Sequence, residues 1–260
     1  FDAEEYRRLN PDLKSYEGDL REHFLQYGIP ELRKYREVDP YISHKELPSD
    51  FDSDAYLALN PDVAFAAITP YEHYLNYGLT EGRKYKFPDL VARYGCDAAP
   101  DKPTILLVGH EASRTGAPIL TWNICHQLSV THNVVAVLLG DGPLLENFQS
   151  DAHVTYALPH EARNNLAIAR YVVDELRKTH PIRHAVVNSI VAEIFCEPLT
   201  VAEIPNILLI HEFAAYTLPQ DKFLHARTWA SRTIFSTELT KCDAQAYFPQ
   251  IFDDAIVIPQ

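Results

Sequence analysis

The chain has 260 residues, enough for one or two domains, and its 47% hydrophobic and 23% charged residues are ordinary for a globular protein. Its net charge of −13 argues against nucleic acid or an anionic membrane surface as the main partner. The four cysteines lie far apart without a CxxC pair, so we expect free thiols in a cytoplasmic protein. The sequence contains no apolar run of about 18 residues, so no membrane span is predicted.

The first 85 residues contain an internal repeat. The segment 1–35 aligns without gaps onto the segment 51–85, with identical Asn-Pro-Asp, Glu-His, Tyr-Gly and Arg-Lys-Tyr motifs at matching positions. A match of this density indicates a duplicated unit.

Each unit is expected to form two short helices. The first begins at an Asp N-cap and is broken by Asn-Pro-Asp, because the residue before Pro avoids the α region. The second is expected to end at a C′ glycine, Gly28 or Gly78. The predicted helices cover 1–9, 20–27, 51–59 and 70–77. We interpret His23, His73 and the regularly spaced aromatic residues as core, and expect the module at 1–85 to serve a protein partner or self-association.

After a Pro-containing linker at 86–102, strands and helices alternate. Continuous apolar runs indicate strands buried on both faces of a parallel sheet. With right-handed crossovers, residues 103–260 should form a doubly wound, Rossmann-like domain. The predicted strands are 104–109, 133–139, 153–157, 184–188, 207–211, 233–236 and 255–258. The predicted helices are 118–128, 161–180, 191–199, 221–230 and 238–248. The expected fold class is therefore α/β, preceded by a small all-α repeat domain.

The most informative segment is 104–120, which indicates a strand, a polar loop and a helix that Pro118 is expected to open. Free N–H groups at a helix N-terminus attract phosphates, and Arg114 adds a suitable positive charge. The spacing of Gly109 and Gly116, without a third glycine, excludes the dinucleotide fingerprint. Ala-Pro follows where a P-loop needs Lys and Ser or Thr, which excludes that motif too. As an alternative, the glycines merely serve the turn.

In a sheet of this kind, ligands bind beyond the carboxyl ends of the strands. That rule selects five loops, at 110–117, 140–143, 188–189, 211–218 and 236–237. His211 ends an apolar run, where a histidine is structural about as often as it is functional. The sequence HEFAA is not HExxH, and neither a Cys/His metal cluster nor a nucleophile elbow is present. Asn188 and Ser189 could bind sugar hydroxyls or cap the next helix, and capping is favoured.

Several of these segments carry a family resemblance. GHEASRTGAPIL, LLIHEFAAYT, TIFSTEL and IVIPQ resemble the N-terminal half of GT-B glycosyltransferases of the large retaining family 4. The repeat, with its NPD, HYLNYG and EGR motifs, resembles modules found ahead of bacterial glycosyltransferases of glycan and surface-polysaccharide synthesis. The resemblance implies a cytoplasmic enzyme, free or peripherally associated with the inner face of the membrane. Such an enzyme transfers a sugar from a nucleotide-sugar to a glycan or lipid-linked acceptor.

The same resemblance implies an active site in a cleft between two domains, with the acceptor bound by the N-terminal half. His211 corresponds to a catalytic histidine beside the transferred sugar. The expected donor-phosphate loop consists of Arg114, Thr115, Gly116 and Ala117. Further acceptor or sugar contacts are expected at His110, Glu111, Asn188 and Glu212. Neither a metal nor a cofactor is expected besides the nucleotide-sugar substrate.

The donor-binding domain of that family would follow residue 260, so we expect this chain to be a piece of a longer protein and inactive by itself. A second hypothesis is a non-catalytic binding or scaffold protein of a glycan-assembly complex. A nucleotide-binding oxidoreductase would need the dinucleotide fingerprint that is missing. A downstream Rossmann-like segment with paired carboxylates would favour the enzyme.

Overall fold

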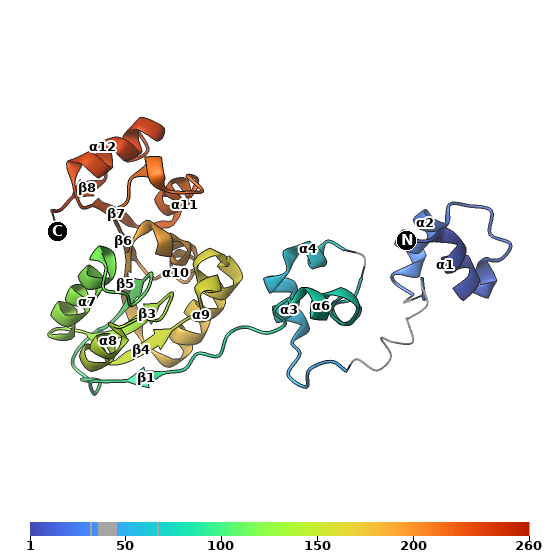
Figure 1. The fold of residues 1–260 in the computed structure, drawn as a ribbon, viewed down its shortest axis with the longest axis horizontal. Coiled ribbons are helices and arrows are strands. Elements are labelled where there is room, and N and C mark those ends of the chain that lie inside the picture. The colour runs from blue at the N-terminus through green and yellow to red at the C-terminus, as the bar shows by residue number, and fades with distance from the viewer. Residues whose placement is uncertain (32, 36–45, 67, 260) are drawn as a thin grey trace. The chain divides into compact units, whose positions relative to one another are not determined.

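The computed structural model describes residues 1–31, 33–35, 46–66 and 68–259. The chain divides into two units, Phe1–Phe87 and Pro88–Gln260, each with buried clusters of its own (Figure 1). Residues 32 and 67 of the predicted repeat, and the last residue of the predicted domain 103–260, lie outside the described residues.

The first unit consists of short helices with equivalent caps. Asp2 and Asp52 each accept hydrogen bonds from two backbone N–H groups of the following turn, as the predicted N-caps require. Asn60 of the second Asn-Pro-Asp motif donates to the backbone oxygens of Tyr56 and Lys84, which ties the two ends of its segment together. The elements are α1 (Ala3–Leu9), η1 (Pro11–Leu13), α2 (Leu20–His23), η2 (Phe24–Gly28), α3 (Ser53–Leu59), α4 (Pro61–Ala64), α5 (Pro70–His73), η3 (Tyr74–Gly78) and α6 (Leu79–Glu81).

The prediction that the second helices end at C′ glycines is wrong. Gly28 and Gly78 are the last residues of wide π-helical turns, and the residue after each keeps a right-handed helical conformation. A Cβ at either glycine would collide with a buried tyrosine hydroxyl, that of Tyr6 or Tyr56. These glycines are therefore needed for close packing, whereas the left-handed C-cap of α6 is Gly82, with φ 65°.

The histidines of the repeat serve the core, as interpreted from the sequence. The Tyr56 hydroxyl lies 2.8 Å from Nδ1 of His73, and the equivalent distance from Tyr6 to His23 is 3.3 Å. Both tyrosines are fully buried, so each histidine satisfies a hydroxyl that would otherwise lack a partner.

The second unit contains one eight-stranded sheet in the order β1-β4-β3-β2-β5-β6-β7-β8. All neighbouring strands are parallel except β1, which pairs antiparallel with β4. From β2 the chain adds β3 and β4 on one side, and then β5, β6, β7 and β8 on the other, so the strand order changes direction between β2 and β5. This switch is typical of a doubly wound, Rossmann-like sheet. The strands are β1 (Arg93–Tyr94), β2 (Thr104–Gly109), β3 (Asn133–Leu138), β4 (Val154–Ala157), β5 (Ile182–Asn188), β6 (Asn206–Ile210), β7 (Arg232–Phe235) and β8 (Ile256–Val257).

Helices cover both faces of this sheet. α7 and α8 pack together on one face, while α9, α10 and α11 lie on the other (Figure 1). The helices are α7 (Gly116–Ser129), α8 (Leu145–Asp151), η4 (His160–Asn164), α9 (Leu166–Thr179), η5 (Ile190–Phe195), α10 (Cys196–Val201), η6 (Ala214–Tyr216), α11 (Lys222–Trp229) and α12 (Glu238–Tyr247). The predicted α/β class and doubly wound sheet are confirmed.

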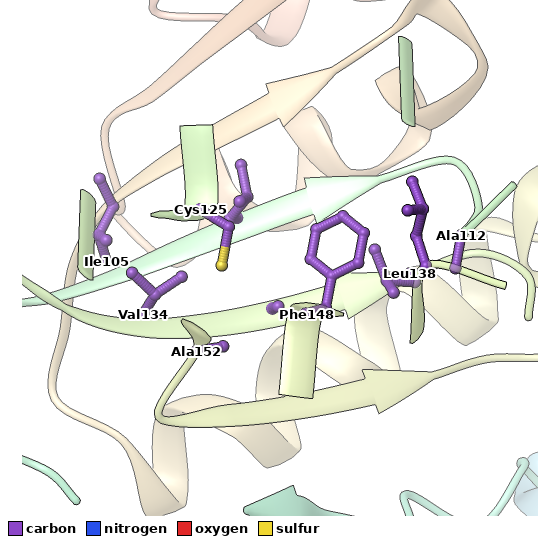
Figure 2. Close-up of a cluster of buried hydrophobic side chains, with 10 residues drawn as sticks. Ile105, Ala112, Cys125, Val134, Leu138, Phe148 and Ala152 are labelled. Carbon is purple, nitrogen blue, oxygen red and sulfur yellow. The ribbon is translucent and has the colours of Figure 1, made fainter. Parts of the chain in front are cut away.

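One core cluster holds α7 and α8 against the sheet. Cys125 of α7 and Phe148 of α8 are fully buried against β2 and β3, together with Val134 and Leu138 (Figure 2). Burying a side chain such as Phe148 contributes about 2–3 kcal/mol. This packing fixes the position of α7, whose N-terminus lies at the carboxyl edge of the sheet.

The largest difference from the sequence interpretation lies in the predicted linker 86–102. From Pro88 onward this segment belongs to the second unit. It contributes β1, and its Ala99 exchanges hydrogen bonds with the side chain of Asn133. A two-residue edge strand leaves no hydrophobic period to detect.

Candidate functional site

The N-terminus of α7 offers free backbone donors. The helix begins at Gly116, two residues before the predicted start, so Pro118 occupies the third position of the first turn, where its missing N–H still costs nothing. The hydroxyl of the N-cap Thr115 lies 3.0 Å from the Ser113 hydroxyl and does not cap the helix. Within the described chain, the N–H groups of Gly116 and Ala117 donate no hydrogen bond. They are therefore available to an anion.

The two glycines of the segment 104–120 differ in whether the surrounding structure leaves room for a side chain. A Cβ at Gly109 would lie 2.8 Å from Thr121, so this glycine allows α7 to pack on β2. A Cβ at Gly116 would meet no atom within 4 Å, and its φ is not positive. Neither the turn nor the packing requires Gly116, which argues against the interpretation that it merely serves the turn.

Gly116 lines a cavity of about 390 Å³ at the carboxyl edge of the sheet. Three separate loops contribute to it: the start of α7, the residue after β6, and the two residues after β7. The lining residues are Gly116, Ala117, Ile119, Leu120, Asn123, His211, Ser236 and Thr237. The structure thus brings the predicted residues Gly116, Ala117 and His211 together.

A buried hydrogen-bond network orients His211. Asn188 is fully buried, and its Nδ2 donates to the Ala117 carbonyl at 3.0 Å and to the Thr121 hydroxyl at 2.6 Å. Its Oδ1 lies 2.6 Å from Nε2 of His211. Because a carbonyl can only accept, Oδ1 must face His211, and Nε2 must therefore carry a proton. In neutral His211 the lone pair consequently resides on Nδ1.

Burial lowers the pKa of His211, although the neighbouring Glu212 opposes this shift. The pKa of His110 is lowered in the same way. Both imidazoles are therefore neutral at pH 7, and His211 keeps the tautomer that Asn188 imposes.

Folding stability is expected to fall as the pH is lowered through the ordinary histidine pKa of 6.5. Below that pH the unfolded chain binds protons that buried His211 and His110 resist, so protonation favours unfolding until the pH reaches their lowered pKa values. Thermal melts at about pH 7.5 and 5.5 should show a drop in Tm that is smaller in His211→Gln than in wild type. An equal drop in both proteins would contradict the role of His211.

Glu212 holds the chain at the end of β5. Its carboxylate accepts hydrogen bonds from the Ser189 hydroxyl and from the backbone N–H groups of Ile190 and His211. Ser189 has φ 84°, a strained conformation for a residue with a side chain, and its hydroxyl caps η5 by accepting from Val191. Capping thus falls to Ser189, while Asn188 positions His211.

Glu111 is held in the first loop by Arg163, which the sequence interpretation missed. The Arg163 guanidinium donates to Glu111 at 2.8 Å and to the backbone oxygen of Leu139 at 2.9 Å. The Ser113 hydroxyl donates to the same carboxylate and, as the main cause, lowers the pKa of Glu111. His110 lies beside this pair, 3.9 Å from Glu111. Arg163 follows β4, another carboxyl end of a parallel strand, and that position was the signal that could have found it.

Arg114 and Thr115 are exposed in the same loop. Among the described residues, Arg114 forms neither a hydrogen bond nor an ion pair, so its charge is available to a ligand.

In the described ranges, no group of three or more His, Cys, Asp and Glu side chains could hold a metal ion. Of the helices described, none is long and apolar enough to cross a membrane.

Comparisons with known proteins identify no relative from sequence: neither a family model nor a curated protein matches. Three solved structures are similar to this chain. HepE from Anabaena, in complex with UDP and glucose, is 15% identical with a TM-score of 0.48, covering 60% of this chain and 44% of that one. A UDP-N-acetylglucosamine 2-epimerase is 12% identical with a TM-score of 0.41, covering 60% and 47%. UGT2 from Phytolacca americana, complexed with UDP-2fluoro-glucose and pterostilbene, is 10% identical with a TM-score of 0.42, covering 62% and 54%.

The chain therefore spans about half the length of these structures, 44% to 54% of each.

Proposed function

We propose that this chain is the acceptor-side half of a GT-B glycosyltransferase, resembling family 4, that moves a sugar from a nucleotide-sugar to a glycan or lipid-linked acceptor in bacterial polysaccharide synthesis. One observation carries the proposal. The free N–H groups of Gly116 and Ala117 share a single cavity with an oriented histidine, His211.

This arrangement suits the departure of a nucleoside diphosphate. As the bond to the sugar breaks, negative charge develops on the diphosphate, and preorganised N–H donors and the Arg114 guanidinium stabilise it. His211, directly after β6, lies on the wall of the same cavity, where it hydrogen-bonds the donor sugar. Its neutral form suits this role because Nδ1 can accept a sugar hydroxyl.

The activity also requires a donor-binding domain, so the chain alone is proposed to be inactive. The nucleotide-sugar serves as substrate, and the reaction uses neither a metal nor a cofactor. Two further parts of the proposal rest on the family resemblance alone. They are that the reaction retains the anomeric configuration, and that the enzyme acts in the cytoplasm or at the inner face of the membrane.

The test is transfer from a nucleotide-sugar by the protein that carries both this chain and a donor-binding domain. Arg114→Ala should lower kcat/KM for the donor by at least about tenfold, because it removes a charge-assisted contact to the diphosphate. The matched control is Arg183→Ala, an exposed arginine near the amino end of β5, which should leave turnover unchanged. Equal kinetics for the two variants would reject the phosphate role of this loop.

A non-catalytic scaffold protein remains the second candidate because the repeat module exposes apolar side chains at matching positions. Tyr27 and Tyr77 are 46% and 41% exposed, and Ile29 and Leu79 are 37% and 44% exposed. Such a repeated surface suits a protein partner or self-association. If the protein recruits its partner fully but transfers no sugar, the scaffold function is favoured.

A further inference from the structure

A second cavity, of about 510 Å³, lies at the same carboxyl edge but on the opposite face of the sheet from α7. Segments that follow β4, β5 and β6 contribute to it, and it shares no lining residue with the cavity at Gly116. The lining residues are Arg163, Asn164, Leu166, Glu193, Ile194, Leu218, Pro219, Asp221, Lys222 and His225.

Glu193 is the most unusual of these residues. It is only 5% exposed, yet it lines the cavity. Its Oε2 accepts a hydrogen bond from Nδ1 of His225, whereas Oε1 has no hydrogen-bond partner in the described chain. Burial raises the pKa of Glu193, and the charge of His225 opposes the rise. A carboxylate oxygen without a hydrogen-bond partner, on a side chain that lines a cavity, is an acceptor available to a ligand.

The charges on the cavity wall balance. Arg163 and Lys222 are matched by Glu193 and Asp221, and Arg163 is already engaged by Glu111. His225 also lines the cavity, and its ring lies between the carboxylates of Glu193 and Glu197. Lys222 donates to the Asn164 side chain at 3.2 Å, and an ammonium keeps further donors for a ligand. This balance disfavours a phosphate or a nucleotide, which needs a net positive wall.

The rest of the wall is apolar, formed by Leu166, Ile194, Leu218 and Pro219. A hydroxyl group of a ligand could donate a hydrogen bond to Glu193, and another could accept one from Lys222. The C–H groups of the ligand would pack against the apolar side chains. The volume falls within the usual range for small-molecule sites, about 300–1,000 Å³.

We propose that this cavity binds a neutral sugar unit, with Glu193 accepting a hydroxyl hydrogen bond and Lys222 donating one. The ligand class follows from the lining residues. That this sugar belongs to the acceptor rests on the proposed function. The cavity and the proposed donor loop are physically joined, because Arg163 lines the cavity and pairs with Glu111 of the first loop.

The experiment is ligand-observed NMR on the intact chain with the methyl α-glycosides of glucose, mannose and galactose as probes. We expect at least one glycoside to bind, and Glu193→Gln and Lys222→Met each to weaken that binding about tenfold. Glu197→Gln is the matched control. Glu197 is 7% exposed, and its Oε2 lies 3.4 Å from Nε2 of His225, but Glu197 does not line the cavity. Its substitution should leave glycoside binding unchanged.

Binding of none of the three glycosides, or equal loss in Glu193→Gln and Glu197→Gln, would overturn the site. Lys222→Met, at a partly exposed position, tests the same site if Glu193→Gln does not fold. Displacement of the glycoside by UDP-glucose, but not by UDP, would overturn the acceptor assignment. It would show that the cavity binds the sugar of the donor. Glycoside binding by a protein that never transfers sugar would leave this site standing and reject the proposed function alone.

Discussion

Gly116→Val is expected to lower kcat/KM for the nucleotide-sugar by about a hundredfold, in the range measured when a preorganised donor to developing charge is lost. A side chain at this position would enter the cavity and keep the diphosphate away from the free N–H groups of Gly116 and Ala117. Because a Cβ at Gly116 meets no atom within 4 Å, Tm should change little. Steady-state kinetics on the protein with its donor-binding domain, together with thermal melts, measures both quantities.

Gly109→Ala is the matched comparison for this variant. Its Cβ would lie 2.8 Å from Thr121 and 3.3 Å from Leu138, so it should destabilise the packing of α7 by about 1–3 kcal/mol. The two glycines therefore predict opposite outcomes: one substitution impairs turnover without unfolding, and the other destabilises the fold. A Gly116→Val protein with normal donor kinetics would show that no phosphate approaches this helix terminus.

The doubly wound sheet was predictable because its central strands are uninterrupted apolar runs. All six residues of β2 are buried, and such a run is typical of a parallel strand covered on both faces. The two-residue β1 was missed because it is too short to show a period. The seven-residue α8 was missed because its N-cap is Leu144, whereas the equally short α1 and α3 begin at recognisable Asp N-caps. Gly28 was misassigned because sequence position alone cannot distinguish a C-cap glycine from one that makes room for a tyrosine hydroxyl.

The candidate site was predictable only where residues lie in the segments that connect a strand to the next helix. Gly116, Ala117 and His211 come to one cavity because parallel strands end at one edge of the sheet. The partnership of Glu111 with Arg163 joins residues that no local motif connects. The tautomer of His211 also escaped prediction, because it depends on the orientation of Asn188, which the packing of α7 determines.

Asn188→Asp is expected to impair turnover through His211 although residue 188 is buried away from the ligand. The amide satisfies three partners: it donates to Ala117 and Thr121 and accepts from His211. A carboxylate cannot donate, so one of its oxygens would face the Ala117 carbonyl, at a cost of about 1–3 kcal/mol in folding free energy. The added negative charge beside the imidazole should raise the pKa of His211 towards or above its ordinary value.

The consequence is a change in the shape of the pH–rate profile. In wild type, His211 stays neutral down to acidic pH because burial lowers its pKa. In Asn188→Asp, the imidazole would become protonated nearer neutrality, and Nδ1 could then no longer accept a sugar hydroxyl. We therefore expect kcat at neutral pH to fall by about tenfold or more and to recover partly as the pH is raised.

Asn188→Ala separates this effect from instability. It removes the same hydrogen bonds and leaves Ala117 and His211 without their buried partner, so the loss of stability should be similar, but it adds no charge. The kcat of Asn188→Ala should fall, but the acid limb of its pH–rate profile should not shift, because the desolvation that lowers the pKa of His211 persists. If both variants lost activity with identical pH profiles, the protonation state of His211 would be irrelevant to the reaction, and its place beside the sugar would be steric alone.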